Sequence, residues 1–520
     1  MPIHEMTALA LRDGLNRGDL SSLDIVDALI ARREAVEPKV NAFAHRFDEA
    51  ARSSARLADD ARARGEAKGA LHGLPLTIKE SMATAGVAST LGVPNKRATL
   101  EARDAVTVEL LRREGAIVLG KTNVPMLLLS HESNNPIWGR TKNPWNLEKS
   151  PGGSSGGESA AIASGSTPWG VGTDIGGSVR VPCAYTGIYG FKPTVDRWSN
   201  LRSYTALAGQ EIVRGQCGPM ARSAADVAYL FRAVDSPKHA ELDPSAIPIP
   251  TGDPAALPLR GLRVGLYVDD GFFPAAASVA RGVRRAAELL AGLGVDVVEF
   301  APPRQLEILE TYYSALSSDG GATATALVGD DPITPELTEL MRIVRIPELA
   351  RPLIAAVLER KGDGRAARLI RALRKKPVQE YWRLTTKRSA LRVEVLEAWR
   401  AARIDAVLCP IHATPPMSHE ASADFVAAGS YSMRYNFLNF PAGSAPIGRV
   451  RANETLRTLP ARPDRFDKKS AAIEAGSAGL PLGVQIVAPP HRDDLVLALM
   501  LALDTAARSE PDFPLTPVNP

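Results

Sequence analysis

The stretch Ser150–Ser178 reads SPGGSSGGESAAIASGSTPWGVGTDIGGS, and it concentrates glycine and serine to a degree that is rare in globular proteins. Glycine-rich turns let backbone N–H groups converge on one point, and small side chains let two segments approach closely. We therefore expect this stretch to lie at the centre of the fold and to bring serine hydroxyls and backbone amides together.

The segments around this stretch alternate between strand and helix patterns. Leu74–Lys79 and Ala116–Gly120 are apolar and read as buried strands, and Val106–Arg113 between them reads as a helix. Later segments repeat the alternation, with expected strands Leu262–Tyr267, Val295–Phe300 and Ala406–Cys409 and expected helices Ala275–Leu290 and Asp493–Ala507. This order predicts an α/β fold with a mixed or parallel sheet.

Two further regions have a helical pattern. Residues 1–70 are expected to form N-terminal helices, with Ser21–Asp24 as a capping box. Residues 304–404 are expected to form a helical insertion and a candidate lid. Within 360–403 there are 14 Lys and Arg against 4 Asp and Glu. This excess is typical of a solvated helix face, and a membrane-surface patch is the alternative.

Composition excludes several classes of protein. Of the 520 residues, 45% are hydrophobic and 23% are charged, and the net charge is +4, so charge alone indicates no nucleic-acid partner. Three widely spaced cysteines indicate neither a disulfide framework nor a zinc site, which fits a reducing compartment. The longest apolar run, Leu495–Leu503, is shorter than the roughly 20 residues of a transmembrane helix. We expect a cytoplasmic protein without a transmembrane segment.

Two familiar motifs match the sequence literally. Gly152–Gly156 fits the GxSxG nucleophile elbow, but the polar residues Asn146–Pro151 before it make a poor strand, and no downstream histidine stands in a distinctive setting. Gly115–Thr122 fits the phosphate-loop pattern GxxxxGK[ST]. Its four central residues are apolar and read as a strand, whereas a phosphate loop must wrap its ligand with free N–H groups.

A third interpretation is a serine nucleophile that is activated by a lysine through a second serine. A serine hydroxyl needs a base to accept its proton, and serine–lysine pairs are a known solution. Lysine is such a base only when it is neutral, which requires burial. Lys79 ends a strand that is expected to be buried, and it is the candidate base.

Several motifs together resemble the amidase signature family. They are, in chain order, GLPLTIKE with Lys79, GKTNVP (Gly120–Pro125), TKNPWN (Thr141–Asn146), PGGSSGGE (Pro151–Glu158), GTDIGGSVRVP (Gly172–Pro182), GIYGFKPT (Gly187–Thr194) and GLPLGVQIV (Gly479–Val487). The resemblance runs from about residue 20 to 505. It implies one large domain over 1–520, with a central mixed β-sheet covered on both faces by helices and a catalytic core at 71–222.

The resemblance implies a role for each matched residue. Ser178 is expected to be the nucleophile, Ser154, after a cis peptide, the proton relay, and Lys79 the base. The oxyanion hole is expected to be formed by the backbone N–H groups of Ile175, Gly176, Gly177 and Ser178. Ser155 is expected to support the relay, and Asp174 and Arg180 to form a buried pair that fixes the nucleophile loop.

The family hydrolyses carboxamides, and the resemblance implies no metal and no cofactor. Met126, Leu127, Leu128 and Leu129 follow GKTNVP, where family members line the acyl pocket, and this apolar run favours aryl or alkyl amides. Carbamates (urethanes) and esters present the same carbonyl and are open alternatives. Glu158, YNFLNFPAG (Tyr435–Gly443) and the segment Val487–Met500 resemble the branch with fatty acid amide hydrolase and acetamidases.

Another function is implied by the same resemblance. The glutamine-hydrolysing component of glutamyl-tRNA amidotransferase shares the fold and triad, and it supplies ammonia to a partner that carries ATP chemistry. The apolar run at 126–129 argues against a glutamine site. An inactive scaffold is disfavoured because all three catalytic residues are present. The expected partner is therefore a small amide, with a homodimer left open.

Overall fold

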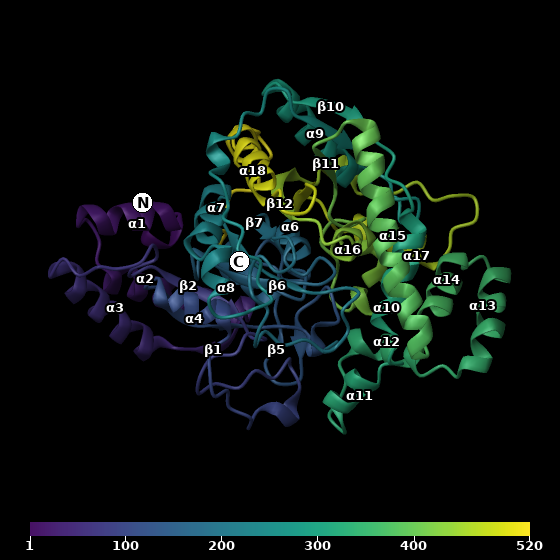
Figure 1. Cartoon of the computed structure of the whole chain (residues 1–520), viewed down its shortest axis with the longest axis horizontal. Helices are drawn as coiled ribbons and strands as arrows, with labels where there is room; N and C mark the ends of the chain where they lie inside the picture. The colour runs from purple at the N-terminus through teal and green to yellow at the C-terminus, as the bar shows by residue number, and fades with distance from the viewer.

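Eleven strands form one continuous β-sheet through the middle of the molecule (Figure 1). The computed structural model describes residues 1–520. In order across the sheet, the strands are β1 (Phe43–Arg46), β3 (Ile117–Thr122), β2 (Pro75–Lys79), β6 (Trp169–Asp174), β8 (Gln216–Ala221), β7 (Tyr189–Lys192), β12 (Ala442–Arg449), β13 (Pro481–Val487), β11 (Ala406–Pro410), β9 (Arg263–Leu266) and β10 (Asp296–Glu299). A separate hairpin pairs β4 (Asn134–Asn135) with β5 (Gly139–Arg140).

The sheet is mixed. Strands β3, β2 and β6 are parallel neighbours, and so are β11, β9 and β10 at the other side. The strands between these two groups, and β1 at the edge, pair antiparallel. The predicted α/β fold with a mixed sheet is confirmed.

Eighteen α-helices surround the sheet (Figure 1). They are α1 (Ala8–Arg17), α2 (Ser22–Val40), α3 (Asp48–Ala63), α4 (Val106–Arg113), α5 (Gly156–Ala163), α6 (Arg180–Thr186), α7 (Ala224–Ala233), α8 (Ser236–Ala240), α9 (Ala277–Gly292), α10 (Gln305–Leu316), α11 (Ala322–Val328), α12 (Pro335–Val344), α13 (Arg351–Arg360), α14 (Gly364–Ala372), α15 (Val378–Ala402), α16 (Ser430–Phe437), α17 (Arg465–Ala475) and α18 (Asp493–Ala507). Helices α4 and α18 have the bounds expected from the sequence.

Helices cover both faces of the sheet. Gly190 and Gly443 belong to neighbouring pairs of the β7–β12 ladder, so they point to opposite faces. A Cβ on Gly190 would clash with Cys183 of α6, and a Cβ on Gly443 would clash with Met500 of α18. Helices α6 and α18 therefore lie on opposite faces, and the two glycines allow both to approach the strands closely.

The N-terminal region contains the expected helices and one strand. The capping box is confirmed, because Ser21 Oγ accepts the N–H of Asp24 at 3.0 Å and the Asp24 carboxylate accepts the N–H of Ser21 at 3.2 Å. Strand β1, which pairs with β3, lies among these helices and was not expected from the sequence. Its four residues, between two helices, are too short for strand alternation to stand out in the sequence.

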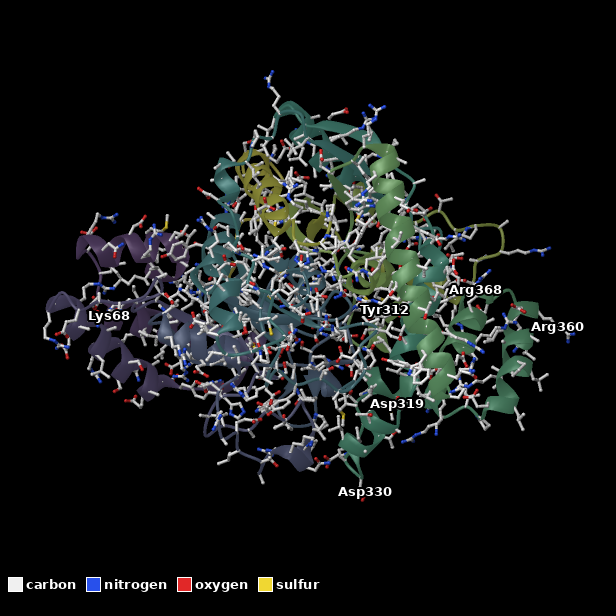
Figure 2. All side chains as sticks on the ribbon, viewed as in Figure 1. Lys68, Tyr312, Asp319, Asp330, Arg360 and Arg368 are labelled. Atoms are coloured by element: carbon white, nitrogen blue, oxygen red, sulfur yellow. The ribbon has the colours of Figure 1, made fainter.

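Residues 304–404 form helices α10 to α15 on one side of the molecule, as the pattern predicted (Figure 1). Basic residues of this region pair with acidic ones on its surface, for example Arg368 with Glu310 and Arg371 with Glu359. Figure 2 shows Arg360 at the outer edge of this group of helices. Among all helices of the chain, none has the length and hydropathy that crossing a bilayer requires.

Candidate active site

Lys79 ends strand β2, beside β6, and its side chain is completely buried. Its Nζ lies 2.7 Å from Ser154 Oγ and 2.8 Å from Thr173 Oγ1. Burial lowers the pKa of Lys79 from 10.5 to about 7, although the negative charge of Asp174 raises it. A substantial fraction of Lys79 is therefore neutral near neutral pH, and neutral lysine can accept a proton.

Ser154 and Ser155 lie in the turn that leads into α5. The Gly153–Ser154 peptide is cis, as the resemblance implied. The Ser155 N–H donates to the carbonyl oxygen of Ser178 at 3.2 Å, and Ser155 Oγ donates to the carbonyl oxygen of Thr173 at 3.3 Å. Ser155 thus connects the turn that carries Ser154 to both ends of the loop that carries Ser178.

The start of α5 is anchored to the sheet by a buried carboxyl group. Glu158 accepts hydrogen bonds from Thr77 of β2 and, at 2.6 Å, from Thr122 of β3. A Cβ on Gly170 of β6 would clash with this carboxyl group, so the strand needs glycine there. Burial raises the pKa of Glu158 to about 7. Because Thr77 and Lys79 are two residues apart on one strand, this anchor also fixes the backbone that carries Lys79.

Ser178 lies in the loop between β6 and α6, and a buried ion pair holds this loop. Arg180 Nη2 lies 2.8 Å from Asp174 Oδ1, Arg180 Nε lies 2.9 Å from Asp174 Oδ2, and both side chains are fully buried. Burial alone would raise the pKa of Asp174, but the charge of Arg180 holds it well below its usual value. Asp174 also accepts the N–H groups of Gly177 and Val179, at 2.7 and 3.1 Å.

Residues near the C-terminus complete this arrangement. Arg180 donates to Gln485 of β13 and to Asn436 of α16, and Asn436 Nδ2 donates to Asp174 Oδ1 at 2.9 Å. No role was expected for either residue from the sequence. Their segments had been marked, because Asn436 lies in YNFLNFPAG and Gln485 in GLPLGVQIV.

The four expected oxyanion donors are not equivalent. The amides of Ile175, Gly176 and Ser178 donate to no group of the protein, so they are free to hold a substrate oxygen. The amide of Gly177 is directed at the Asp174 carboxylate instead. Gly177 therefore does not belong among the free donors. Its single N–H already donates to Asp174, which lies at the start of the same loop.

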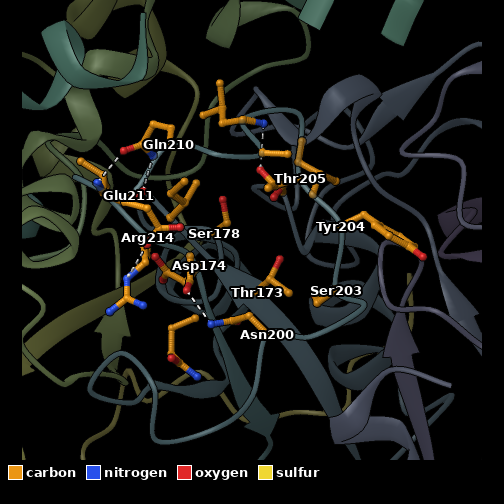
Figure 3. A pocket seen from close by; sticks show the side chains of 18 of the residues that line it. Thr173, Asp174, Ser178, Asn200, Ser203, Tyr204, Thr205, Gln210, Glu211 and Arg214 are labelled. Carbon is orange, nitrogen blue, oxygen red and sulfur yellow. Dashed lines mark hydrogen bonds and ion pairs between the residues drawn. The ribbon is translucent and has the colours of Figure 1, made fainter. Parts of the chain in front are cut away.

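Two cavities meet at Ser178. One, the polar cavity, has about 290 Å³, and only 9 of its 25 lining residues are hydrophobic; most of the lining belongs to segments 196–216 and 243–245 (Figure 3). The other has about 170 Å³, and 18 of its 26 lining residues are hydrophobic, including members of α10, α12 and α14. Ser154 borders the polar cavity, while Leu128, Leu129 and Ile175 border both.

The expected substrate segment reaches the cavities only in part. Leu127 borders the polar cavity, and Leu128 and Leu129 border both cavities. Met126 borders neither cavity. It is buried in an apolar cluster with Val93 and other side chains, among them Met341, which borders the apolar cavity. The chain turns sharply here, with φ of 60° at Leu127 and 61° at Leu128, so consecutive side chains point in different directions.

Neither literal motif has the context that its chemistry needs. Ser154 is hydrogen-bonded to Lys79, whereas the ring nitrogens of His412 and His419 contact Tyr185 and the backbone of Leu147. Ser154 therefore lacks the histidine of a nucleophile elbow. Residues 117–122 form strand β3, whose backbone groups pair within the sheet and are not free to wrap a phosphate.

Comparisons with known proteins agree with this architecture. A family model described as Amidase matches residues 24–497. Fatty-acid amide hydrolase 1 of Sus scrofa is 36% identical over 439 residues, which cover 83% of this chain and 75% of that protein. Fatty acid amide hydrolase 1 of Caenorhabditis elegans is 30% identical over 504 residues, covering 95% and 87%. A solved fatty acid amide hydrolase has a TM-score of 0.86 at 27% identity, covering 97% of this chain and 85% of that one.

The matched range includes every strand of the central sheet and the whole loop region around Ser178. The chain therefore belongs to the amidase signature family. It is an enzyme that hydrolyses amides.

Proposed function

We propose that this enzyme hydrolyses amides with an apolar acyl group through Ser178, Ser154 and Lys79. The observation that carries the proposal is the 2.7 Å hydrogen bond between buried Lys79 and Ser154, at the point where a polar and an apolar cavity meet. The apolar cavity suits an alkyl or aryl acyl group, because burial of apolar surface contributes about 25 cal/mol per Å². The polar cavity suits the amine.

The first half of the reaction forms an acyl-enzyme. Ser178 Oγ attacks the carbonyl carbon and transfers its proton to Ser154, whose own proton moves to neutral Lys79. The free amides of Ile175 and Gly176, with that of Ser178, stabilise the negative charge on the former carbonyl oxygen. When the C–N bond breaks, the proton on Lys79 returns through Ser154 to the leaving amine.

The second half repeats these steps with water. A water molecule attacks the acyl-enzyme, its proton moves through Ser154 to Lys79, and Ser178 leaves with a proton returned along the same path. Esters and carbamates present the same carbonyl to the same serine, so we include both in the proposed substrate range.

A fluorophosphonate probe, which reacts with activated serines, tests the nucleophile. We expect the label on Ser178, mapped by mass spectrometry, and no label in Ser178→Ala. This variant should also lose turnover of a long-chain anilide by at least about 10³-fold, since a nucleophile cannot be replaced by binding alone. A label on Ser154, or full turnover by Ser178→Ala, would contradict the proposal.

The same assay separates hydrolysis by this chain alone from the amidotransferase function. The purified chain should release amine from simple amides without ATP or a second protein. Turnover that appears only with glutamine, ATP and a partner would favour the amidotransferase alternative.

A further inference from the structure

A tyrosine from the helical insertion contacts the nucleophile loop from outside the catalytic core. We propose that Tyr312 of α10 is a positioning residue, which fixes the Ile175–Gly176 peptide so that the Gly176 N–H points at the substrate oxyanion. This inference rests on the proposed function of Ser178. It concerns Tyr312, which is not one of the three proposed catalytic residues Ser178, Ser154 and Lys79.

The contact is a partly buried hydrogen bond between distant parts of the chain. Tyr312 Oη donates to the carbonyl oxygen of Ile175 at 3.1 Å, although the two residues are 137 positions apart. The Tyr312 side chain is only 3% exposed, and Figure 2 shows it in the interior of the molecule. A hydrogen bond from a side chain that is itself held by packing keeps its acceptor in one orientation.

The orientation of that carbonyl decides the orientation of the next amide. In a trans peptide the C=O and the N–H point in opposite directions, because the peptide unit is planar. With the Ile175 oxygen held by Tyr312, the Gly176 N–H must point to the other side. That N–H is one of the free amides beside Ser178.

The space around Gly176 fits this role. A Cβ on Gly176 would clash with the Tyr312 hydroxyl, while every other atom outside Gly176 and its chain neighbours would lie at least 3.6 Å away. The backbone of Gly176 does not have a positive φ, so its conformation does not by itself require glycine. Position 176 is therefore glycine because any side chain there would collide with the Tyr312 hydroxyl.

The next peptide along the chain provides a contrast. His131 Nε2 contacts the carbonyl oxygen of Gly176 at 3.2 Å, and the Gly177 N–H on the other side of that peptide donates to Asp174. The protein thus holds both ends of the second peptide and only the carbonyl end of the first. The end left open is the one that faces the substrate.

The Tyr312 ring also borders the apolar cavity, where we place the acyl group. An acyl group that packs on this ring restricts the same side chain whose hydroxyl holds the loop. We therefore expect loss of the hydroxyl to lower kcat, whereas the ring keeps its contribution to KM.

Tyr312→Phe tests this directly, because it removes the hydroxyl and keeps the ring. We expect kcat for a long-chain anilide to fall about 10-fold or more with KM changed less than about 3-fold, since misdirecting one oxyanion donor affects the transition state. Tyr229→Phe is the matched control: it removes a tyrosine-to-carbonyl hydrogen bond, to Ala70 at 2.7 Å, elsewhere in the protein. It should keep wild-type kcat.

Inhibitors separate positioning from a general structural effect. A long-chain trifluoromethyl ketone forms a tetrahedral adduct with serine, and its inhibition constant should rise in Tyr312→Phe by the same factor as kcat/KM falls. The corresponding fatty acid makes no such adduct, and its inhibition constant should stay unchanged. Equal losses for both inhibitors would overturn the proposal, as would a wild-type kcat.

A second variant keeps the test valid if the loop is disturbed. Gly176→Ala should lose activity because its methyl group displaces the hydroxyl, and adding Tyr312→Phe should restore part of the loss. If the double variant instead lost activity by the product of the two single-variant factors, the proposal would be overturned. An inactive wild type would count against the proposed function itself, whereas an active wild type with an equally active Tyr312→Phe would count against this inference alone.

Discussion

The two cavities that meet at Ser178 are built from different parts of the chain. The polar cavity is lined mainly by the segment 196–216, which connects strands β7 and β8 of the central sheet. The apolar cavity is lined largely by the helices of 304–404 and by the segment 423–433. The shared residues come from the loop after β6, from Leu128 and Leu129, and from Leu207 of the segment 196–216.

If Ser178 is the nucleophile, as proposed, this difference separates substrate selectivity from the chemical step. Residues on one side can change without altering the other, while Ser178 and its neighbours serve both. Changes at the junction should therefore affect all substrates equally. Changes in one cavity should affect only the part of the substrate that occupies it.

The largest effect is expected at the junction. Lys79→Ala should lower kcat/KM by about 10³-fold or more for every amide, because the base is removed for both halves of the reaction. In the wild type, kcat/KM should fall about tenfold per pH unit below about pH 7, because Lys79, with its pKa lowered to about 7, becomes protonated and cannot accept a proton.

Lys121→Met is the control for this pH profile. Burial also lowers the pKa of Lys121, to about 8, but its Nζ contacts Ala88 and Ser89 and not the reacting serines. This variant should keep the acid limb of the wild type. A flat wild-type profile between about pH 5 and 9 with chemistry rate-limiting would contradict a lysine base.

A smaller, selective effect is expected in the apolar cavity. Leu340→Gln should raise KM for long-chain amides about 10-fold and leave acetyl amides nearly unchanged, because the loss is that of apolar contact with the chain. Leu349→Gln makes the same change at a residue that is 97% exposed, and it should leave KM unchanged for both long-chain and acetyl amides. Equal losses for long and short acyl groups would remove Leu340 from the acyl site.

The smallest effect is expected in the polar cavity. Glu211 lies at its edge and is mostly exposed to solvent. Glu211→Gln should weaken turnover of amides with a cationic amine by about 2- to 5-fold at low salt and leave neutral amines unchanged, since exposed charges interact weakly. A change that followed the acyl chain length would contradict the division between the two cavities.

The sequence predicted the features that depend on local pattern. The helices Val106–Arg113 and Asp493–Ala507, the capping box at Ser21 and strand β2 could be read from neighbouring residues. Buried Lys79 at the end of its strand followed from three apolar neighbours. These features need no knowledge of the rest of the chain.

Other features depend on distant partners and have no local pattern. Tyr312 and Gln485 reach the nucleophile loop from 137 and 305 positions away. The use of the Gly177 amide by Asp174 depends on how the loop folds back on itself. Met126 borders neither cavity, and the sequence MLLL does not suggest the positive φ values at Leu127 and Leu128 with which the chain turns here.

The long separation between Arg180 and Gln485 has a consequence for synthesis of the protein. At about 5–20 residues per second, the 305 positions between them take roughly 15–60 s to translate. During that time Ser178 has already left the ribosome, while Asn436 and Gln485, which contact the ion pair that holds its loop, are not yet made. An unfinished or truncated chain therefore carries Ser178 without the contacts that Asn436 and Gln485 make beside its loop, and we expect such a chain to hydrolyse no amide.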